Sequence, residues 1–541
     1  MGRANDFEHI GVMIDNSRNA VMNLPTVKKM IAILEKLGFN TLMLYTEDTY
    51  EVERQPYFGY LRGRYSKAEL KELDAYAAKH GVELIPCIQT LAHLNAIMRW
   101  PQYAAIRDTN DILCVGEEKV YELIEDMFAT LAECFTSRVV NVGMDEAEAL
   151  GLGNYLKKHG YQKRLEILGN HLLRVSQIAE RYGFTLCMWS DMFYKLLTGS
   201  FYGDKDVEIS EEQAAEVAAM IPENVRLIYW DYWKWEPEHF DKHIQIHQKF
   251  AKDLWYAGAL WNWVGFAPHN AFTIDAMETA VASCRKGQVR NMIFTMWGDD
   301  GAECARFSLL PSLYMIACNI RGITDEAERK HGFEELFGIA FDDFMLLDFP
   351  GTTNDRLNNN ADKYLLYNDP FLGILDMAIT EDDGDRFGAC VKRLEPFTAH
   401  AEWGYLFESA KCLCEVLEIK ANLGQRTRKA YQEEDREALL ELLSVYEEVI
   451  RRTERFYHAY EQQWMIENKP HGFEVQDIRL GGLIQRMKHC AKRLQEFVSG
   501  ERSELPELSE HLLDPFGNGE TYEPHDFCVN SWREIASVNI I

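Results

Sequence analysis

Val139-Val140-Asn141-Val142-Gly143-Met144-Asp145-Glu146 is a short, mostly apolar segment that ends in two adjacent carboxylates. We predict a buried strand over Val139–Met144, with the two acids at its C-terminal end. Adjacent acids repel each other and burial adds to that cost, so such a pair suits a site where two carboxylates need different pKa values. The alternative is a helix N-terminus, where Asp145 and Glu146 would be stabilised by the helix dipole. This segment alone leaves both interpretations open.

Seven further apolar runs of strand length lie on either side of this segment. Helix-like stretches separate them, and several of these end in a glycine just before a strand, as at Gly38, Gly81 and Gly183. Eight strands alternating with helices over about 290 residues are typical of an α/β protein with a (β/α)8 TIM barrel. A doubly wound open sheet is the alternative, but no glycine-rich phosphate-binding motif follows the first strand. The predicted strands are His9–Ile14, Thr41–Tyr45, Glu83–Ile88, Val139–Met144, Thr185–Trp189, Arg226–Trp230, Leu254–Trp261 and Asn291–Trp297.

The pattern changes after about residue 321, where strand-like runs give way to long amphipathic helical stretches. We therefore predict a barrel over residues 1–321, followed by an α-helical C-terminal domain over residues 322–541. A homodimer formed through the helical domain is a hypothesis, which a light-scattering mass of one chain would contradict. The predicted C-terminal helices cover residues 382–394, 400–423, 433–464 and 475–497.

The composition argues against several kinds of partner. The 541 residues include 57 basic and 86 acidic side chains, and the resulting net charge of −29 disfavours nucleic acid and anionic membranes. No apolar run approaches the roughly 20 residues that span a bilayer, and the first six residues do not resemble a signal peptide. The twelve cysteines are scattered, many of them in apolar stretches, as is typical of reduced thiols. These features predict a cytoplasmic protein.

Polar and aromatic residues occupy the C-terminal ends of the predicted strands, which is where a barrel builds its active site. Eight of the twelve tryptophans lie between residues 189 and 297. Aromatic walls with interleaved carboxylates and one arginine suit a pyranose, because ring faces stack and hydroxyls bind charged groups. For each tryptophan, packing beneath the loops is the alternative. The strand-end residues are Asp15, Arg18, Glu47, Asp48, Gln89, His93, Asp145, Glu146, Trp189, Asp191, Trp230, Asp231, Trp261, Asn262, Trp263, Trp297, Asp299 and Asp300.

Four segments, in the right order, resemble motifs of glycoside hydrolase family 20, the β-N-acetylhexosaminidases. Asn141–Glu146 resembles the family's His/Asn-x-Gly-x-Asp-Glu signature, and Asp15–Arg18 resembles its Asp-x-Ser-Arg. Pro86–His93 is similar to the family stretch that ends in Pro-Gly-His, and Met296–Asp299 resembles its Trp-Gly-Glu/Asp. The likeness extends to the helical half, as in a bacterial branch of the family that carries such a domain.

This resemblance implies an exo-acting, retaining enzyme that releases terminal β-linked GlcNAc or GalNAc without metal or cofactor. In this family the substrate's own 2-acetamido oxygen attacks the anomeric carbon and forms an oxazolinium intermediate. The resemblance makes Glu146 the general acid and then the general base, and makes Asp145 the carboxylate that holds the acetamido N–H. Arg18 is then expected to bind the 3- and 4-hydroxyls, and Asp299 the 4- or 6-hydroxyl.

The resemblance also assigns a set of residues around the acids. His93, with Asp48 or Glu47, resembles the family relay that tunes the acid, and either acid fits as its partner. The tryptophans that match those enclosing the acetamido methyl and the sugar ring are Trp189, Trp230 and Trp297.

The chain departs from the family pattern after the seventh strand. There the family places Trp-Tyr, whose tyrosine bonds the acetamido oxygen, whereas this chain has Trp261-Asn262-Trp263. We retain Trp261 as a sugar-binding residue. The donor to the acetamido oxygen stays open between Asn262, Tyr256 and another residue.

Two rival functions remain at this point: a glycosidase with a conventional carboxylate nucleophile on the same barrel, and a sugar-binding protein without chemistry. A possible metal site, formed by His239, His243 and His247 at helical spacing, has a simpler interpretation as a solvated helix face. We therefore expect no metal.

Overall fold

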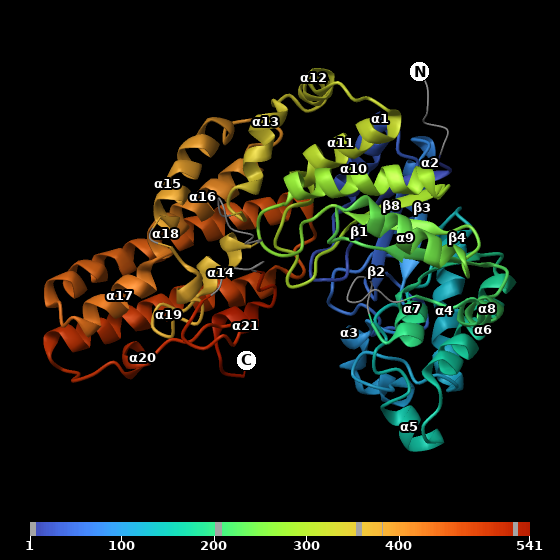
Figure 1. Ribbon diagram of the computed structural model, residues 1–541, viewed down its shortest axis with the longest axis horizontal. Coiled ribbons are helices and arrows are strands. Elements are labelled where there is room, and N and C mark those ends of the chain that lie inside the picture. Colours follow the sequence, from blue (N-terminus) through green and yellow to red (C-terminus); the bar gives the residue numbers. More distant parts are fainter. Residues whose placement is uncertain (1–6, 201–207, 353–359, 381, 523–527, 541) are drawn as a thin grey trace. The chain divides into compact units, whose positions relative to one another are not determined.

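Eight parallel strands close into a barrel in sequential order, with β1 paired to β8 (Figure 1). The computed structural model describes residues 7–200, 208–352, 360–380, 382–522 and 528–540. Residues 1–6, on which part of the signal-peptide prediction rests, lie outside the described residues. The closed barrel confirms the predicted fold and excludes the open sheet. The strands are β1 His9–Asp15, β2 Thr41–Glu47, β3 Glu83–Ile88, β4 Val139–Asn141, β5 Thr185–Trp189, β6 Val225–Trp230, β7 Trp255–Ala259 and β8 Asn291–Met296.

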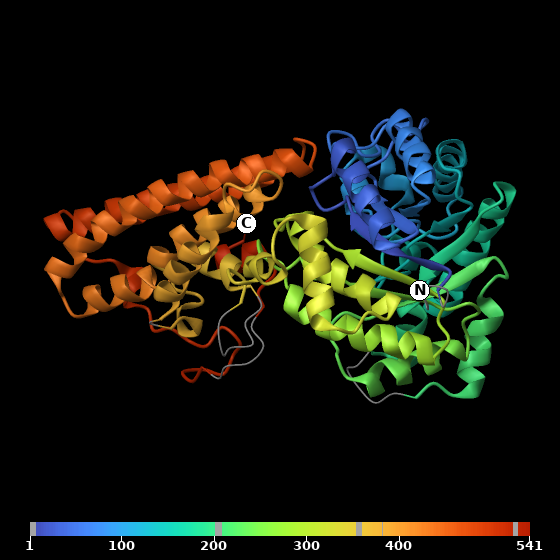
Figure 2. The same cartoon turned by 90° about the horizontal axis from the view of Figure 1, so that it is seen from above.

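Helices follow the strands and surround the barrel (Figures 1 and 2). Local sequence signals set their ends: α1 begins where the Asn23 side chain accepts from the backbone N of Thr26, and it ends at Gly38 with φ 79°. The helices of this region are α1 Leu24–Leu37, α2 Lys67–Lys79, α3 Asn95–Met98, α4 Glu118–Cys134, α5 Asn154–His159, α6 Arg164–Arg181, α7 Asp191–Thr198, α8 Glu211–Met220, α9 Pro237–Gln248, α10 Asn270–Lys286 and α11 Leu310–Arg321.

The C-terminal ends of five strands differ from the sequence prediction; among them, β7 ends at Ala259 instead of Trp261 and β8 at Met296 instead of Trp297. β4 ends at Asn141 instead of Met144, because the backbone turns into the left-handed region at Gly143 and Met144. β1 and β2 instead run further than predicted, and they include Asp15 and Glu47. Asp145 and Glu146 therefore lie in a turn after a three-residue strand, and not in the first turn of a helix.

The C-terminal region is helical, as predicted. α18 and α19 are its longest helices, and they run side by side as a hairpin (Figures 1 and 2). Its helices are α12 Glu326–Phe337, α13 Phe341–Phe344, α14 Ala361–Tyr367, α15 Asp383–Leu394, α16 Gly404–Lys420, α17 Leu423–Gln432, α18 Arg436–Glu467, α19 Phe473–Ser499, α20 Pro506–Ser509 and α21 Trp532–Ala536.

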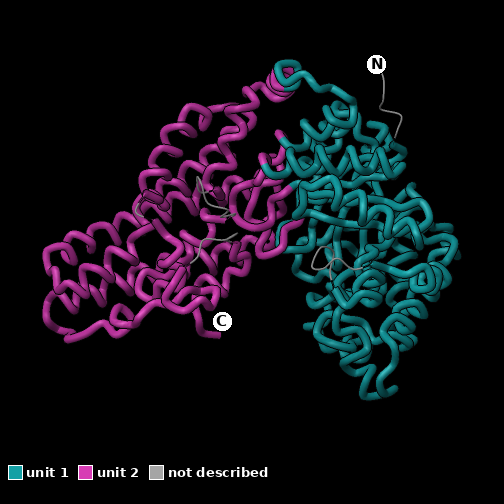
Figure 3. Tube along the Cα trace, in the orientation of Figure 1, with its two compact units in different colours: residues 1–260, 272–296, 312–329 teal, residues 261–271, 297–311, 330–541 magenta. Residues whose placement is uncertain are grey.

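The chain divides into two compact units (Figure 3). Unit 1 contains residues 1–260, 272–296 and 312–329, and unit 2 contains residues 261–271, 297–311 and 330–541. The segments that follow β7 and β8 thus pack as part of the helical unit. The domain boundary between residues 321 and 322 stays a prediction, since these units divide the chain differently.

Two further observations bear on the sequence predictions. No helix among the described residues is long and apolar enough to cross a membrane. All twelve cysteines are free thiols, and Cys528 is the one that is exposed.

Candidate active site

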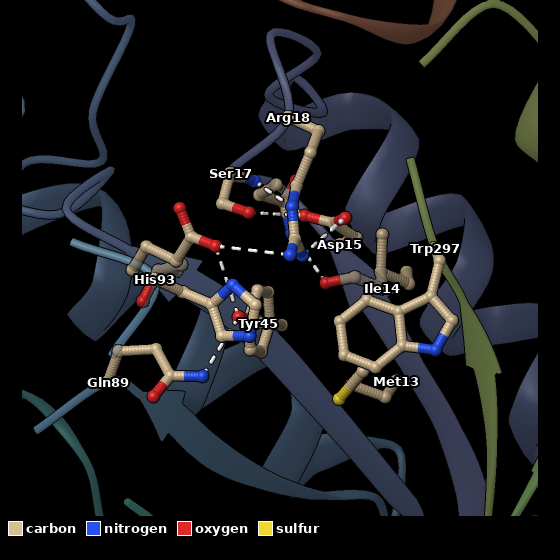
Figure 4. A network of polar contacts seen from close by, with 12 residues as sticks. Met13, Ile14, Asp15, Ser17, Arg18, Tyr45, Gln89, His93 and Trp297 are labelled. Atoms are coloured by element: carbon tan, nitrogen blue, oxygen red, sulfur yellow. Dashed lines mark hydrogen bonds and ion pairs between the residues drawn. The ribbon is translucent and has the colours of Figure 1, made fainter. Parts of the chain in front are cut away.

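Arg18 is held at the end of β1 by acids from two strands (Figure 4). Asp15 accepts hydrogen bonds at Oδ1 from the backbone N of Ser17 at 2.8 Å and its hydroxyl at 2.7 Å. The other oxygen of Asp15 accepts from Arg18 Nη1 at 3.1 Å, and Arg18 Nη2 lies 3.4 Å from Glu47 Oε1. The guanidinium also lies over the ring of Tyr45, at 5.1 Å from its centroid. A planar cation is therefore fixed in one orientation at the strand ends.

The structure distinguishes the two neighbouring acids after β2. The β2–β3 ladder shifts register between Tyr45 and Glu47, and Glu47 has φ 44°. Glu47 accepts from the Tyr45 hydroxyl at 3.1 Å, and burial raises its pKa although Arg18 opposes the rise. Asp48 instead pairs with Arg62, whose Nε lies 2.9 Å from Asp48 Oδ1. Glu47 is therefore the acid that shares contacts with Arg18.

The turn after β4 separates the two adjacent carboxyls. Gly143, Met144 and Glu146 have φ values of 73°, 70° and 49°. At Gly143 a Cβ would lie 2.0 Å from Gln89 Oε1, so only glycine fits. Asp145 is buried, whereas the side chain of Glu146 is 47% exposed. Neighbours in sequence thus have different environments, which is the asymmetry that two carboxylates with different tasks require.

Asp145 is surrounded by donors. Gln89 Nε2 donates to Asp145 Oδ1 at 2.6 Å, and His93 Nε2 lies 3.3 Å from Oδ2. The same glutamine accepts from the backbone N of Met144 at 3.1 Å, so it holds both the carboxylate and its turn. Burial acts to raise the pKa of Asp145, but the nearby positive charge of His93, with the Gln89 hydrogen bond, lowers it overall. Asp145 is therefore ionised at neutral pH.

His93 lies within reach of both acids. Its Nε2 is 3.5 Å from Glu146 Oε2 as well as 3.3 Å from Asp145. Burial lowers the pKa of His93, but the charge of Asp145, with a smaller effect of Glu47, raises it to about 9. The imidazole is therefore positively charged at neutral pH. Its electrostatic partner after β2 is Glu47, while Asp48 is paired elsewhere.

Asp191 is a site residue to which the sequence alone assigned no role. It is the first residue of α7 and is 1% exposed. Its Oδ2 accepts from the backbone N of Glu146 at 2.9 Å, and its Oδ1 accepts from Trp230 Nε1 at 3.4 Å. Burial, reinforced by the charge of Asp145, raises the pKa of Asp191 to about 8. Its place after β5 was visible in the sequence, but its partners lie 45 and 39 residues away.

Two of the candidate tryptophans belong to the barrel unit. Trp189 is buried at the end of β5, and its backbone N donates to the carbonyl of Gly143 at 3.2 Å. The ring of Trp230 stacks on Tyr232, with the centroids 5.2 Å apart, and also meets Trp233. Trp230 thus joins Asp191 to an aromatic surface beyond β6.

The remaining candidates belong to the helical unit. Trp261 stacks on Trp263 with centroids 4.3 Å apart, and both are buried. Trp297 is partly exposed and Asp299 is exposed, as a group that meets a ligand needs to be. Asn262 is fully buried, and neither atom of its amide has a hydrogen-bond partner among the described residues. A buried amide without partners is costly unless something else bonds it.

The Tyr256 hydroxyl already donates a hydrogen bond within the protein, so it is not available to a ligand in this arrangement. The hydroxyl donates to the backbone carbonyl of Asp231 at 3.1 Å, and the ring meets Phe240 of α9. The side chain is therefore engaged between the barrel and its helices. Of the two candidate donors to the acetamido oxygen, Asn262 is the one whose amide has no hydrogen-bond partner among the described residues.

The histidines of α9 do not form a solvated face. His243 and His247 are buried, and burial lowers their pKa values to about 4 and about 3. His247 Nε2 lies 2.9 Å from Ser190 Oγ, and His239 Nε2 lies 2.5 Å from Asp231 Oδ2. The solvated-face interpretation was wrong because His243 and His247 pack against Tyr229 of β6 and Tyr194 of α7. The described residues contain no cluster of three metal-ligating side chains.

Two family models match the chain. Residues 7–245 match the model described as "Glycosyl hydrolase family 20, catalytic domain". Residues 342–526 match the one described as "Glycoside Hydrolase 20C C-terminal domain". The first match includes β1 to β6 with their site residues, and the second lies within the helical region.

Named relatives show the same likeness. The chain is 24% identical to Hexosaminidase D of Homo sapiens over 253 residues, which is 43% of this chain and 47% of that protein. It is 26% identical to Hexosaminidase D of Bos taurus over 271 residues, or 47% of this chain and 70% of the relative. A solved structure of a GH20 exo-β-N-acetylglucosaminidase from Vibrio harveyi, in complex with N-acetylglucosamine, shares 14% identity. Its TM-score is 0.47, over 62% of this chain and 58% of that one. The chain spans about half the length of the human relative that it matches.

Proposed function

We propose that this chain, which combines a glycosyl hydrolase family 20 catalytic domain with a glycoside hydrolase 20C C-terminal domain, is an exo-acting β-N-acetylhexosaminidase. It removes terminal β-linked GlcNAc or GalNAc from a sugar or oligosaccharide, with retention of configuration. One observation carries the proposal: the adjacent carboxyls after β4 have opposite environments. Asp145 is buried and ion-paired with His93, and Glu146 is half exposed. Substrate-assisted hydrolysis needs this division of tasks.

Asp145 orients the nucleophile, which belongs to the substrate. Its ionised carboxylate accepts the acetamido N–H and turns the acetamido oxygen toward the anomeric carbon. As that oxygen bonds to the carbon, positive charge spreads over the new ring, and the negative charge of Asp145 stabilises it. The lowered pKa of Asp145 supports this role, because the carboxylate has to stay ionised beside a cation.

Glu146 moves the proton. In the first step its carboxyl donates a proton to the glycosidic oxygen while the bond between that oxygen and the anomeric carbon breaks. In the second step a water attacks the anomeric carbon, the bond to the acetamido oxygen breaks, and Glu146 takes the water's proton. Two inversions at the same carbon give net retention. The exposure of Glu146 supports contact with a leaving group and then with water.

The sugar hydroxyls and ring faces have candidate partners. Arg18, oriented by Asp15 and Glu47, presents a fork of donors to the 3- and 4-hydroxyls. The exposed Asp299 would accept from the 4- or 6-hydroxyl. Asn262, whose buried amide has no described partner, is our candidate donor to the acetamido oxygen.

The remaining binding assignments rest on the resemblance. Trp230 and Trp297, with Trp189 and Trp261, would enclose the sugar ring and the acetamido methyl. His93 would lower the pKa of Asp145 and interact with Glu146 in both protonation states.

A conventional carboxylate nucleophile has less support. Such a mechanism needs a second ionised carboxylate beside the acid. Asp145 is ionised, but both of its oxygens have partners, Gln89 and His93. The other buried acid that contacts Glu146 is Asp191, and its pKa of about 8 keeps it protonated at neutral pH. A sugar-binding protein without chemistry would have no need for two acids held in opposite environments.

The test is release of p-nitrophenol from the β-N-acetylglucosaminide and the β-N-acetylgalactosaminide. We compare the wild type with Glu146→Gln and Asp145→Asn, and we add a thiazoline derived from GlcNAc as inhibitor. Asp126→Asn is the matched control, because Asp126 is a buried acid paired with Arg54 and Gln55 away from the strand ends. We expect each site variant to lose on the order of 100-fold or more in kcat, as for a removed acid–base group.

The outcomes separate the three functions. Turnover that both site variants lose, with inhibition by the thiazoline, supports the substrate-assisted mechanism. Turnover without thiazoline inhibition and with full activity of Asp145→Asn supports a conventional nucleophile. An inert wild type that still binds the sugar supports a binding protein.

A further inference from the structure

We propose that Asp191 is a positioning residue that aligns the acid Glu146 with the leaving group and holds the wall residue Trp230 in place. This inference rests on the proposed function, since it assigns Glu146 the role of proton donor. Three neighbouring strand ends meet at this one carboxyl: Asp191 follows β5, Glu146 follows β4, and Trp230 ends β6. Its two oxygens therefore couple the proton donor to the sugar-binding wall.

The backbone of Glu146 needs such a partner. Its φ of 49° lies in the left-handed region, which is costly for a residue with a Cβ. The Asp191 carboxyl accepts from its N–H at 2.9 Å, which stabilises this conformation from outside the turn. The direction of the Glu146 side chain follows from that backbone conformation. A weakened contact would let the carboxyl move relative to the glycosidic oxygen, and a displacement of about 1 Å can cost roughly 100-fold in rate.

The contact to Trp230 links the same carboxyl to substrate binding. Trp230 Nε1 donates to Asp191 Oδ1 at 3.4 Å, and the indole ring stacks on Tyr232 on its other side. The ring is thus held both by a polar contact at its edge and by stacking on its face. Loss of this polar contact is expected to make the Trp230 ring more mobile while leaving the Glu146 carboxyl largely in place.

Charge neutrality supports the arrangement. Two ionisable neighbours of Asp191 are Asp145 and Glu146, and the charges of both oppose its ionisation. Burial, with these charges, raises its pKa to about 8. A neutral Asp191 adds no third negative charge beside the ionised Asp145, whose own positive partner is His93. An asparagine at this position is therefore close in both shape and charge to the residue that acts at neutral pH.

The experiment compares Asp191→Ala and Asp191→Asn on two substrates that differ in their need for acid assistance. Hydrolysis of the p-nitrophenyl β-N-acetylglucosaminide needs more help from an acid than hydrolysis of the 2,4-dinitrophenyl one, whose leaving group departs readily as an anion. The control is Asp74→Asn, because Asp74 is a buried aspartate on α2 that accepts from the backbone N of Thr136 at 3.1 Å.

We expect Asp191→Ala to lose on the order of 100-fold in kcat on the p-nitrophenyl substrate, and about tenfold or less on the dinitrophenyl one. Asp191→Asn keeps an oxygen for the Glu146 N–H but presents an amide N–H₂ to the Trp230 indole. It should retain kcat within about threefold and raise KM, because the wall alone is loosened. Asp74→Asn should leave both constants and the substrate ratio unchanged.

Specific results would overturn the proposal. Equal losses on both substrates, with wild-type turnover intact, would make Asp191 structural and leave the proposed function standing. An Asn variant as impaired in kcat as the Ala variant would show that the charge of Asp191, and not its hydrogen bond to Glu146, matters. An inert wild type would overturn the proposed function and this inference together.

Discussion

The residues that follow β1 to β6 and those that follow β7 and β8 are held by different parts of the chain. The first group lies in unit 1 and is fixed by contacts among the strand ends, such as those of Arg18 with Asp15 and Glu47. The second group lies in residues 261–271 and 297–311, which pack with the helices of unit 2 (Figure 3). The candidate site residues are thus divided between unit 1, which we call the barrel frame, and unit 2, which we call the helical frame.

A buried ionic cluster fixes the segment after β8. Asp300 follows Asp299 directly, and it pairs with Lys363 of α14 at 3.0 Å and Arg479 of α19 at 2.8 Å. Glu303 contacts the same two cations at 2.9 and 2.8 Å. Lys363 and Glu303 are almost fully buried. Because each charge has partners of opposite sign, removal of one leaves the others uncompensated.

The segment after β7 is held by neutral and acidic groups. Asp362 of α14 accepts from the backbone N atoms of Phe266 and Ala267 at 2.6 and 2.7 Å. Asp348 accepts from Asn270 Nδ2 at 2.8 Å and from the next backbone N at 2.9 Å. These contacts span about 80 to 100 positions in the chain. The helical unit therefore shapes both segments that carry Trp261, Asn262, Trp297 and Asp299.

The largest expected effect comes from the helical frame. Arg479→Met should lower the free energy of unfolding by about 3–5 kcal/mol, because Asp300 and Glu303 lose one of their two cations. It should also raise KM, since Asp299 is adjacent to Asp300. Urea unfolding and steady-state kinetics measure the two effects.

Arg486→Met is the matched control for this variant. Arg486 lies on the same helix, but it pairs with Asp369 and makes no described contact with residues 297–311. It should lose stability with an unchanged KM. If both variants change KM equally, the helical frame has no specific effect on the segment after β8.

The next effect tests the barrel frame. His93→Asn removes the positive charge that lowers the pKa of Asp145, so the acidic limb of kcat/KM should move to higher pH. The activity at pH 7 should fall by roughly tenfold to 100-fold. A pH–rate profile provides the measurement, with His80→Asn as control, since His80 pairs with Glu35 at the end of α2. An unmoved acidic limb would contradict the assigned role of His93.

A smaller effect separates the two acids after β2. Glu47→Gln should raise KM by about tenfold, because Arg18 loses one charged partner. Asp48→Asn should change KM by less than about threefold and should instead lower Tm, because Asp48 pairs with Arg62. Kinetics and thermal unfolding of both variants provide the check. The opposite ranking would return Asp48 to the relay with His93.

The smallest effect concerns the pH dependence of stability in the helical frame. Burial raises the pKa of Asp348 to about 7, so between pH 4 and pH 7 the folded state binds more protons than the unfolded state. Asp348 therefore makes its full contribution to the free energy of unfolding below its pKa in the unfolded state. That contribution is lost as the pH rises through its folded-state pKa of about 7. In Asp348→Asn, the free energy of unfolding should decrease less steeply with rising pH, by up to about 1.4 kcal/mol per pH unit. Urea unfolding at pH 5 and pH 8 tests it, and parallel pH dependences would exclude the effect.

The sequence predicted the barrel strands well because parallel strands buried on both faces read as continuous apolar runs. Their C-terminal ends then pointed to Asp15, Arg18, His93 and the two acids. The early end of β4 was missed because a left-handed φ at Met144 has no residue signature.

The other features that the sequence prediction missed depend on partners that lie far apart in the chain. Asp191 was visible after β5, but its hydrogen bonds to Glu146 and Trp230 depend on how three strand ends meet in space. Asp300 bonds to Lys363 and Arg479, which lie 63 and 179 positions away in the chain. No local sequence pattern indicates such pairs. His243 and His247 were assigned to solvent because spacing identifies a helical face but not what covers it.

Gly143 has a consequence for the evolution of this site. A positive φ by itself can be adopted by asparagine, as at Gly38, whose φ of 79° and ψ of 19° are left-handed helical and where an added Cβ would meet no atom within 4 Å. At Gly143 the space is already filled by Gln89, which is tied to the neighbouring turn and to Asp145. A lineage could therefore replace Gly38 by asparagine at little cost, while any change at position 143 would require a coordinated second change at position 89. The glycine and the glutamine are expected to be inherited as a pair.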